Sequence, residues 1–215
     1  MNHSLNEIEA MCKRAARGAG LPWGLAEEAA KGTRWLSSFG FPGAELLAAL
    51  LEMNDRLPPA DLAPLTLAGV WSAPSGRMSP LIAGAALSDC AVQLMDAGRI
   101  EMERVCVPLL LVPFAAGAAL RLETPVAVEW AGVYLATDGR QLCARGAPDA
   151  YTAMLADKVA FTTPAEMTDR REPVLRGSAP AEAWDRLGVL AHRTYAPATE
   201  ASRLRGAGAG LSDND

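Results

Sequence analysis

The segment VAVEWAGVYLATDGRQLCARG, residues 126–146, constrains the fold more than any other part of the chain. Apolar and polar residues alternate along much of it, as they do in strands with one buried face. Asp138-Gly139 interrupts the alternation with the composition of a two-residue turn. The segment therefore predicts a β-hairpin, and with it antiparallel strand pairing.

Helices are predicted ahead of this hairpin. Ser4 and Glu7 have capping-box spacing, and apolar residues then recur at helical intervals. A second helix is expected between residues 22 and 40 and a third over 44–54, which together make a helical layer. Trp23, at the start of the second helix, is expected to pack in the core as a helix-entry residue, or else to form the wall of a pocket.

The rest of the chain mixes strands and helices, which favours an α+β fold. We expect a helical N-terminal layer packed on a mixed, partly antiparallel sheet with flanking helices; a doubly wound α/β sheet is the alternative. The chain of 215 residues fits a single domain, divided into a helical layer (1–55), a mixed sheet with helices (66–193) and a docked C-terminal tail (194–215). The segments behind this expectation are strands near 65–71, 99–107 and 158–163, a short buried apolar run at 108–114, and helices near 81–98 and 178–193.

Composition excludes several classes of function. The net charge of −5 argues against nucleic acid and against an anionic membrane surface. The longest apolar stretch is interrupted by Pro108 and Pro113 and is too short to span a membrane. Four scattered cysteines and two histidines predict no metal site, and the absence of a glycine-rich nucleotide motif predicts no cofactor. Free thiols and the lack of a signal peptide predict a cytoplasmic protein.

The loop SAPSGRMSP, residues 72–80, is the first candidate site. It lies between a predicted strand and a predicted helix, where free N–H groups and the helix dipole favour an anion. Ser75 adds a hydroxyl donor, and Arg77 can hold a carboxylate or a phosphate through two hydrogen bonds. The alternative is an ordinary polar connection that caps the helix.

The segment HRTYAPATEASRLRGAGAGLSDND, residues 192–215, is the second candidate site. Arg193, Arg203 and Ser202 are expected to bind an anionic ligand, because guanidinium and hydroxyl groups are its natural donors. Glu200 is the candidate general base, and Tyr195 the candidate proton donor. The alternative is a flexible, glycine-rich chain end.

Three segments resemble an uncharacterised bacterial family, domain of unknown function 3726. They are residues 4–31 (SLNEIEAMCKRAARGAGLPWGLAEEAAK), the apolar run PLLLVPFAAGAA, and the C-terminal segment quoted above. The resemblance implies no activity, cofactor or catalytic residue.

Two functions are consistent with these features. The first is a small-molecule enzyme or catalytic subunit acting on a small anionic metabolite that carries a carboxylate. The second is a non-catalytic accessory or scaffold subunit whose glycine-rich tail docks on a partner chain or within a homo-oligomer.

Overall fold

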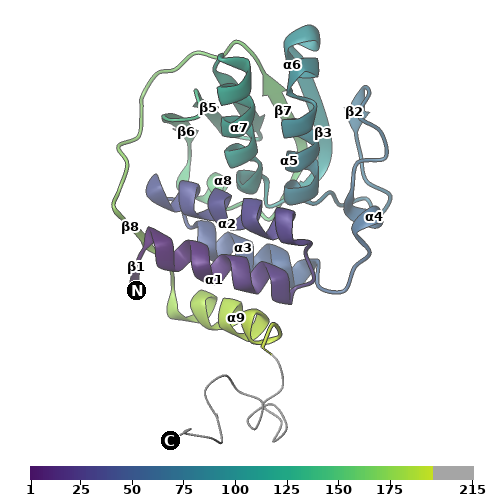
Figure 1. The fold of residues 1–215 in the computed structure, drawn as a ribbon. Helices are drawn as coiled ribbons and strands as arrows, with labels where there is room; N and C mark the ends of the chain where they lie inside the picture. The colour runs from purple at the N-terminus through teal and green to yellow at the C-terminus, as the bar shows by residue number, and fades with distance from the viewer. Residues whose placement is uncertain (196–215) are drawn as a thin grey trace, which may run out of the picture.

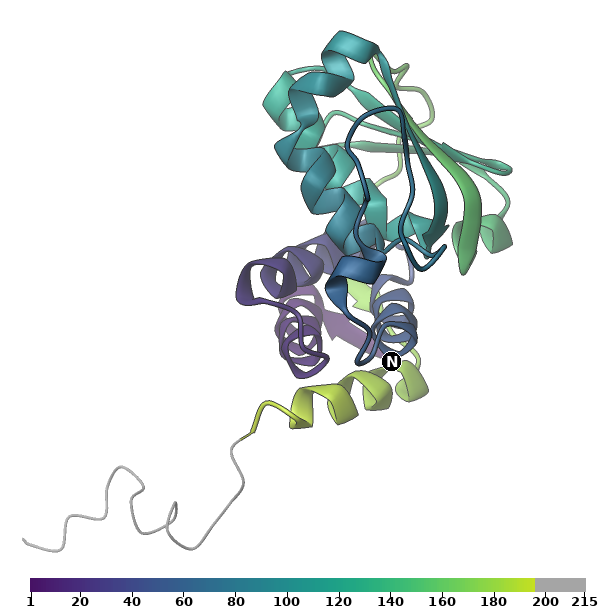
Figure 2. The same ribbon diagram turned by 90° about the vertical axis from the view of Figure 1, so that its right-hand side faces the viewer.

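The computed structural model describes residues 1–195 and has two parts, a helical layer and a six-stranded sheet with its own helices (Figure 1). Viewed from the side, the sheet's helices lie on one of its faces, and the other face looks outward (Figure 2). The α+β fold with a mixed sheet is therefore confirmed, and the doubly wound alternative is wrong. Only one pair of neighbouring strands in the six-stranded sheet is parallel.

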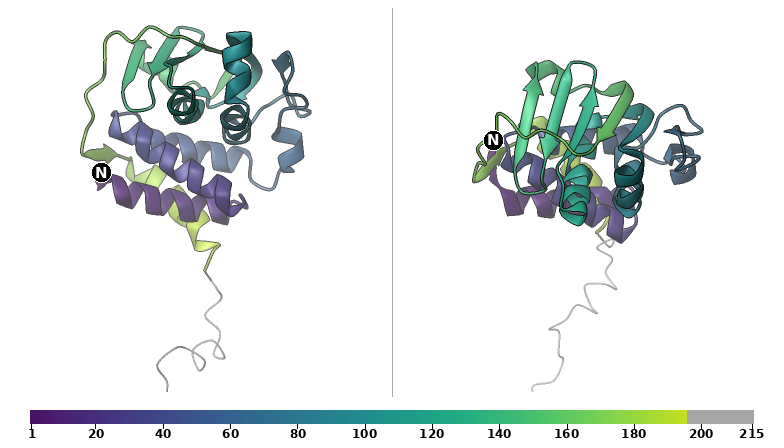
Figure 3. Two further views of the ribbon diagram at one scale, coloured as in Figure 1. Left: turned by 45° about the horizontal axis from the view of Figure 1, so that its top comes forward. Right: turned by 90° about the horizontal axis from the view of Figure 1, so that it is seen from above.

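The helical layer consists of α1 (Leu5–Gly18), α2 (Trp23–Ser38), α3 (Gly43–Met53) and α9 (Ala181–His192). Figure 3 shows α1 and α2 side by side, with the ends of the sheet's helices directly above them. The predicted capping box begins α1: the Ser4 hydroxyl accepts from the Glu7 N–H at 3.2 Å, and the Ser4 N–H donates to the Glu7 carboxylate at 2.7 Å. Two short strands, β1 (Asn2–Ser4) and β8 (Arg176–Ser178), pair antiparallel beside this layer.

The six-stranded sheet has the order β2-β3-β7-β4-β5-β6. Strand β2 runs parallel to β3, and the other neighbours are antiparallel. Strand β7 therefore lies between two strands that both precede it in the chain. The strands are β2 (Val70–Trp71), β3 (Arg99–Cys106), β4 (Val126–Trp130), β5 (Val133–Thr137), β6 (Leu142–Gly146) and β7 (Leu155–Thr162).

Helices α5 (Pro80–Asp89), α6 (Ala91–Ala97) and α7 (Val112–Leu122) cover the inner face of the sheet, and the 3-10 helix η1 (Pro108–Leu111) leads into α7. The short helices α4 (Pro59–Leu62) and α8 (Pro148–Tyr151) complete the described elements. One cluster of buried side chains runs from the helical layer through α7 into the sheet. Within residues 1–195, no helix is long and apolar enough to cross a membrane.

The predicted hairpin is present, but its turn is longer than expected. Thr137 pairs with Leu142, so residues 138–141 form a four-residue connection between β5 and β6. The Asp138 carboxylate causes this difference, because it accepts from the N–H groups of Arg140 and Gln141 at 2.9 and 2.7 Å. A second, tighter hairpin joins β4 to β5 through residues 131–132, where Trp130 pairs with Val133.

Two further expectations are corrected. The single helix predicted over 81–98 is two helices, because Cys90, with φ −97° and ψ 18°, departs from helical geometry between α5 and α6. Trp23 is not a core residue: its side chain is 63% exposed, and the Arg17 guanidinium lies 4.4 Å from its ring centroid. A cation over the ring face explains how an aromatic residue is stabilised at this surface position.

Candidate functional site on the outer face of the sheet

The first residues of the predicted tail site are attached to the helical layer. The Arg193 guanidinium donates two hydrogen bonds to the Asp55 carboxylate, at 2.7 and 3.1 Å. These bonds lower the pKa of Asp55 and raise the pKa of Arg193. The Tyr195 hydroxyl accepts from Arg14 at 3.2 Å, and the side chain is largely exposed. Arg193 thus already has an intramolecular carboxylate, and its role toward a ligand stays a prediction.

The other residues assigned to the tail site are Glu200, Ser202 and Arg203. They lie outside the described residues, and their roles stay predictions.

The 72–80 loop does join a strand to a helix, β2 to α5, as predicted. Its amide groups, however, are engaged within the protein. The N–H of Ser75 donates to the Asp61 backbone carbonyl at 3.0 Å, and the N–H of Arg77 donates to the Ser75 hydroxyl at 3.3 Å. The N–H groups of Met78 and Ser79 donate to Arg104 and Leu62 carbonyls at 2.9 and 3.0 Å. An anion at this loop would therefore depend on the Arg77 side chain, which forms no ion pair within residues 1–195.

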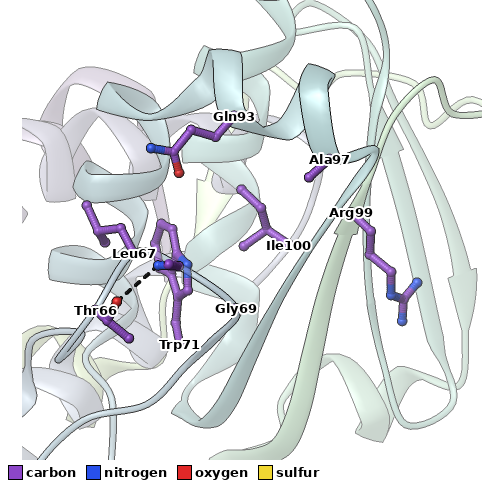
Figure 4. A pocket seen from close by; sticks show the side chains of 9 residues that line it. Thr66, Leu67, Gly69, Trp71, Gln93, Ala97, Arg99 and Ile100 are labelled. Carbon is purple, nitrogen blue, oxygen red and sulfur yellow. Dashed lines mark hydrogen bonds between the residues drawn. The ribbon is translucent and has the colours of Figure 1, made fainter.

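A pocket of about 570 Å³ lies beside β2, between residues 66–69, α6 and β3. Figure 4 shows Trp71 and Ile100 on its apolar side, with the amide of Gln93 nearby. The Thr66 hydroxyl already accepts from the Ala68 N–H at 3.1 Å, and Arg99 points away from the pocket (Figure 4). The side chains drawn there supply apolar surface and one amide, which suits apolar contact better than proton transfer or binding of an anion.

A larger concavity, of about 710 Å³, opens on the outer face of the sheet, where β4, β5 and β6 meet the segment after β7. Three of its residues form a row across adjacent strands: Glu129 pairs with Tyr134, and Tyr134 pairs with Arg145. Directly paired residues point to the same face, so this row presents a carboxylate, a phenol and a guanidinium side by side. Thr162 and Glu166 complete the polar lining.

The charged side chains of this concavity act on the pKa of Tyr134. Burial raises the pKa of Tyr134, the charge of Arg145 lowers it, and the charge of Glu129 raises it further, while Glu166 acts in both directions, through its backbone carbonyl and through its charge. The net effect is upward, so the phenol stays protonated at neutral pH, and its hydroxyl donates to the Glu166 carbonyl at 3.2 Å. The ring thus holds the segment after β7 against the sheet.

Arg145 is the residue of this site best suited to an anion. Its guanidinium carbon lies 4.6 Å from the Tyr134 ring centroid, which restricts the side chain to one region of the concavity. Within residues 1–195 it forms no ion pair, whereas Arg99 on the same face is paired with Glu101 at 2.8 Å. A stacked guanidinium with free N–H groups can bind a carboxylate through two hydrogen bonds.

These residues were not predicted as a site from the sequence, although the sequence contains a signal for them. Glu129, Tyr134 and Arg145 each occupy a polar position in an alternating strand, so their outward direction is readable. Whether these side chains become neighbours depends on the tight turn at residues 131–132. Only one residue of this turn, Gly132, is a typical turn residue. In the described part of the chain, no three histidine, cysteine, aspartate or glutamate side chains are grouped as metal ligands.

Comparisons with known proteins add little about activity. No curated protein matches the chain. A crystal structure of malate dehydrogenase from Entamoeba histolytica aligns at 10% sequence identity and a TM-score of 0.45, over 67% of this chain. This chain covers 45% of that one, which is less than half its length. A likeness this weak carries no conclusion about this protein.

The family resemblance is confirmed for the N-terminal part of the chain, which includes all of α1, α2 and α3. Residues 3–79 match the family described as "Protein of unknown function (DUF3726)".

Proposed function

We propose that this protein binds a small carboxylate metabolite in the concavity on the outer face of the sheet, as an enzyme or catalytic subunit acting on that metabolite. The observation that carries the proposal is Arg145, a guanidinium without an ion-pair partner in residues 1–195, held over Tyr134 in a concavity of about 710 Å³. The concavity has room for a small molecule, and its polar groups come from adjacent strands of one sheet.

The neighbouring groups suit chemistry on such a ligand. Tyr134 is neutral at physiological pH; its O–H donates to the Glu166 carbonyl, and its oxygen is left to accept a hydrogen bond from a ligand. Glu129 and Glu166 are the two carboxylates of the lining and are the groups able to accept a proton from a bound molecule. An arginine that binds the anion, beside a glutamate and a tyrosine, was also predicted for the C-terminal tail. The proposed residue types are therefore the same, but they lie on the sheet and not in the tail.

The test is ligand-induced thermal stabilisation of the full chain with a panel of mono- and dicarboxylic acids. Arg145→Gln should remove the stabilisation, because losing a charge-assisted hydrogen bond costs about 1.5–3 kcal/mol, or roughly 10–150-fold in affinity. Arg140→Gln is the matched control, since Arg140 is an exposed arginine of the neighbouring β5–β6 turn. If Arg145→Gln keeps the response while Arg203→Ala or Glu200→Gln loses it, the tail holds the carboxylate and the proposal for the sheet face fails.

A second function, docking on a partner chain, is favoured by exposed apolar side chains on α6 and in the segment before β2, the two segments that flank the pocket. Leu65, Val92 and Met95 are 67%, 61% and 49% exposed, and β2 is one of the two edge strands of the six-stranded sheet. Exposed apolar groups at a sheet edge are typical of association surfaces, and a two-fold contact between two copies would bury the same groups twice.

Light scattering after size-exclusion chromatography tests this second function. Val92→Glu should dissociate a homo-oligomer, whereas Val189→Glu, at an equally exposed valine of α9, should not. Deleting residues 198–215 tests separately whether the glycine-rich tail holds the copies together. A wild-type chain that is monomeric at all concentrations would contradict association with a second copy.

A further inference from the structure

The outer-face concavity carries a negative charge as well as the positive charge of Arg145. Glu129 and Arg145 flank Tyr134 in one row, each directly paired with it on a neighbouring strand. Adjacent strands lie about 4.8 Å apart, so the two backbones are separated by roughly 10 Å. Both side chains line the concavity, and the charges of both act on the Tyr134 phenol.

These two opposite charges do not neutralise each other. Neither Glu129 nor Arg145 forms an ion pair within 4 Å anywhere in residues 1–195. Farther along the same outer face, Glu101 and Arg99 do form one, at 2.8 Å. The row therefore presents an unpaired carboxylate and an unpaired guanidinium on the two strands that flank Tyr134, with the guanidinium over the tyrosine ring.

A ligand that matches this row has a carboxylate and an ammonium group on a short carbon chain. Building on the proposed carboxylate site, we propose that the ligand is a free amino acid. Its carboxylate binds the Arg145 guanidinium, its ammonium group binds the Glu129 carboxylate, and its carbon atoms lie against Tyr134. Glu129 is thus a specificity-determining residue, because a carboxylic acid without an amino group would leave it without a partner.

The charge of the lining also ranks the amino acids. Glu166 adds a second carboxylate, so the concavity holds two negative side chains and one positive side chain. An amino acid with a cationic side chain is therefore favoured over one with an anionic side chain, since like charges repel at short range.

Isothermal titration calorimetry at low ionic strength tests the proposal on the full chain. The twenty standard amino acids are titrated first, followed by the deaminated acid and the decarboxylated amine derived from the tightest binder. We expect lysine or arginine to bind more tightly than glutamate. Each of the two truncated analogues should bind at least tenfold more weakly than the parent amino acid, because each lacks one charge-assisted hydrogen bond.

Two variants assign the groups, and a third is their control. Glu129→Gln should reduce the discrimination between amino acid and deaminated acid to less than about threefold, while Arg145→Gln should abolish binding of both. Glu101→Gln, which removes a carboxylate of the same face that is already paired with Arg99, should leave binding unchanged. Circular dichroism melting of each variant separates loss of binding from loss of folding.

The outcomes distinguish this inference from the proposed function. If the deaminated acid binds as tightly as the amino acid and both depend on Arg145, the carboxylate site stands and the amino-acid inference is overturned. If glutamate binds more tightly than lysine, the ranking of amino acids by the charge of the lining is overturned. If no amino acid and no carboxylic acid binds, both proposals fail.

Discussion

The Cys12 thiol illustrates how strongly a single buried position in this fold can change chemistry. Cys12 lies in α1 with no exposed surface, and burial raises its pKa to about 12, although a hydrogen bond with Thr33 acts in the opposite direction. At pH 8 only about one thiol in ten thousand is then ionised, and the thiolate is the reactive form. We predict that Cys12 is not labelled by Ellman's reagent in the folded protein, whereas the partly exposed Cys90 is labelled.

Peptide mapping after timed labelling measures this difference, and labelling in denaturant is the control that shows both thiols to be competent. Equal labelling rates for Cys12 and Cys90 in the folded protein would show that α1 opens readily.

At the same scale, sequence patterns predict the direction of a side chain better than its neighbours. The outward direction of Glu129 and Arg145 follows from strand alternation, but the row they form with Tyr134 requires two correct hairpin registers. For Trp23, by contrast, even the burial of the side chain was predicted wrongly. Its burial was predicted from its place at the start of a helix, whereas the cations of Lys13 and Arg17 stabilise it at the surface.

The contact between α1 and α9 depends on a glycine at their crossing. A Cβ atom at Gly18 would lie 1.8 Å from the Leu190 carbonyl oxygen, which is backbone and cannot rotate away. We predict that Gly18→Ala destabilises the protein by about 1–3 kcal/mol, because α9 must shift to relieve the overlap. Urea denaturation followed by circular dichroism gives the difference in the free energy of unfolding.

Gly188, in α9 itself, provides the matched control. A Cβ atom there would meet nothing within 4 Å, so Gly188→Ala should stabilise the helix by about 0.5–1 kcal/mol through its better helix propensity. If both alanine variants were equally stable, α9 would not be packed on α1 in solution as the structure has it.

Elements with their own local signals were predicted, and elements that depend on context were not. The capping box of α1 and the left-handed Gly98 that ends α6 each act within a few residues, so the sequence shows them directly. The segment 108–114 has no such signal, since a short apolar run fits a buried strand as well as a buried helix. In the structure Pro108 and Pro113 occupy first-turn positions of η1 and α7, where a missing N–H costs nothing.

At the scale of the whole molecule, the order of the strands in the sheet could not be predicted from the sequence. Strand β7 follows β6 in the chain but inserts between β3 and β4. The centre of the sheet is therefore held together by pairing between segments that are distant in the sequence. The outer-face concavity depends on the same insertion, because Thr162 and Glu166 come from β7 and the segment after it. Local patterns contain no information about such pairing.

The helical layer and the sheet share one core, and this bears on the predicted single domain. Leu47 of α3 is fully buried, and it belongs to the same cluster of buried side chains as Phe161 of β7. A shared core couples the two parts, so we predict one cooperative unfolding transition with equal calorimetric and van't Hoff enthalpies.

Leu47→Ala, a substitution in the helical layer alone, should then lower the free energy of unfolding by about 2–5 kcal/mol for the whole molecule. Hydrogen exchange measures this directly: the β7 amides should lose as much protection as those of α3. If only α3 and its neighbouring helices lost protection, the helical layer and the sheet would be separate folding units, because a defect in one would leave the other intact.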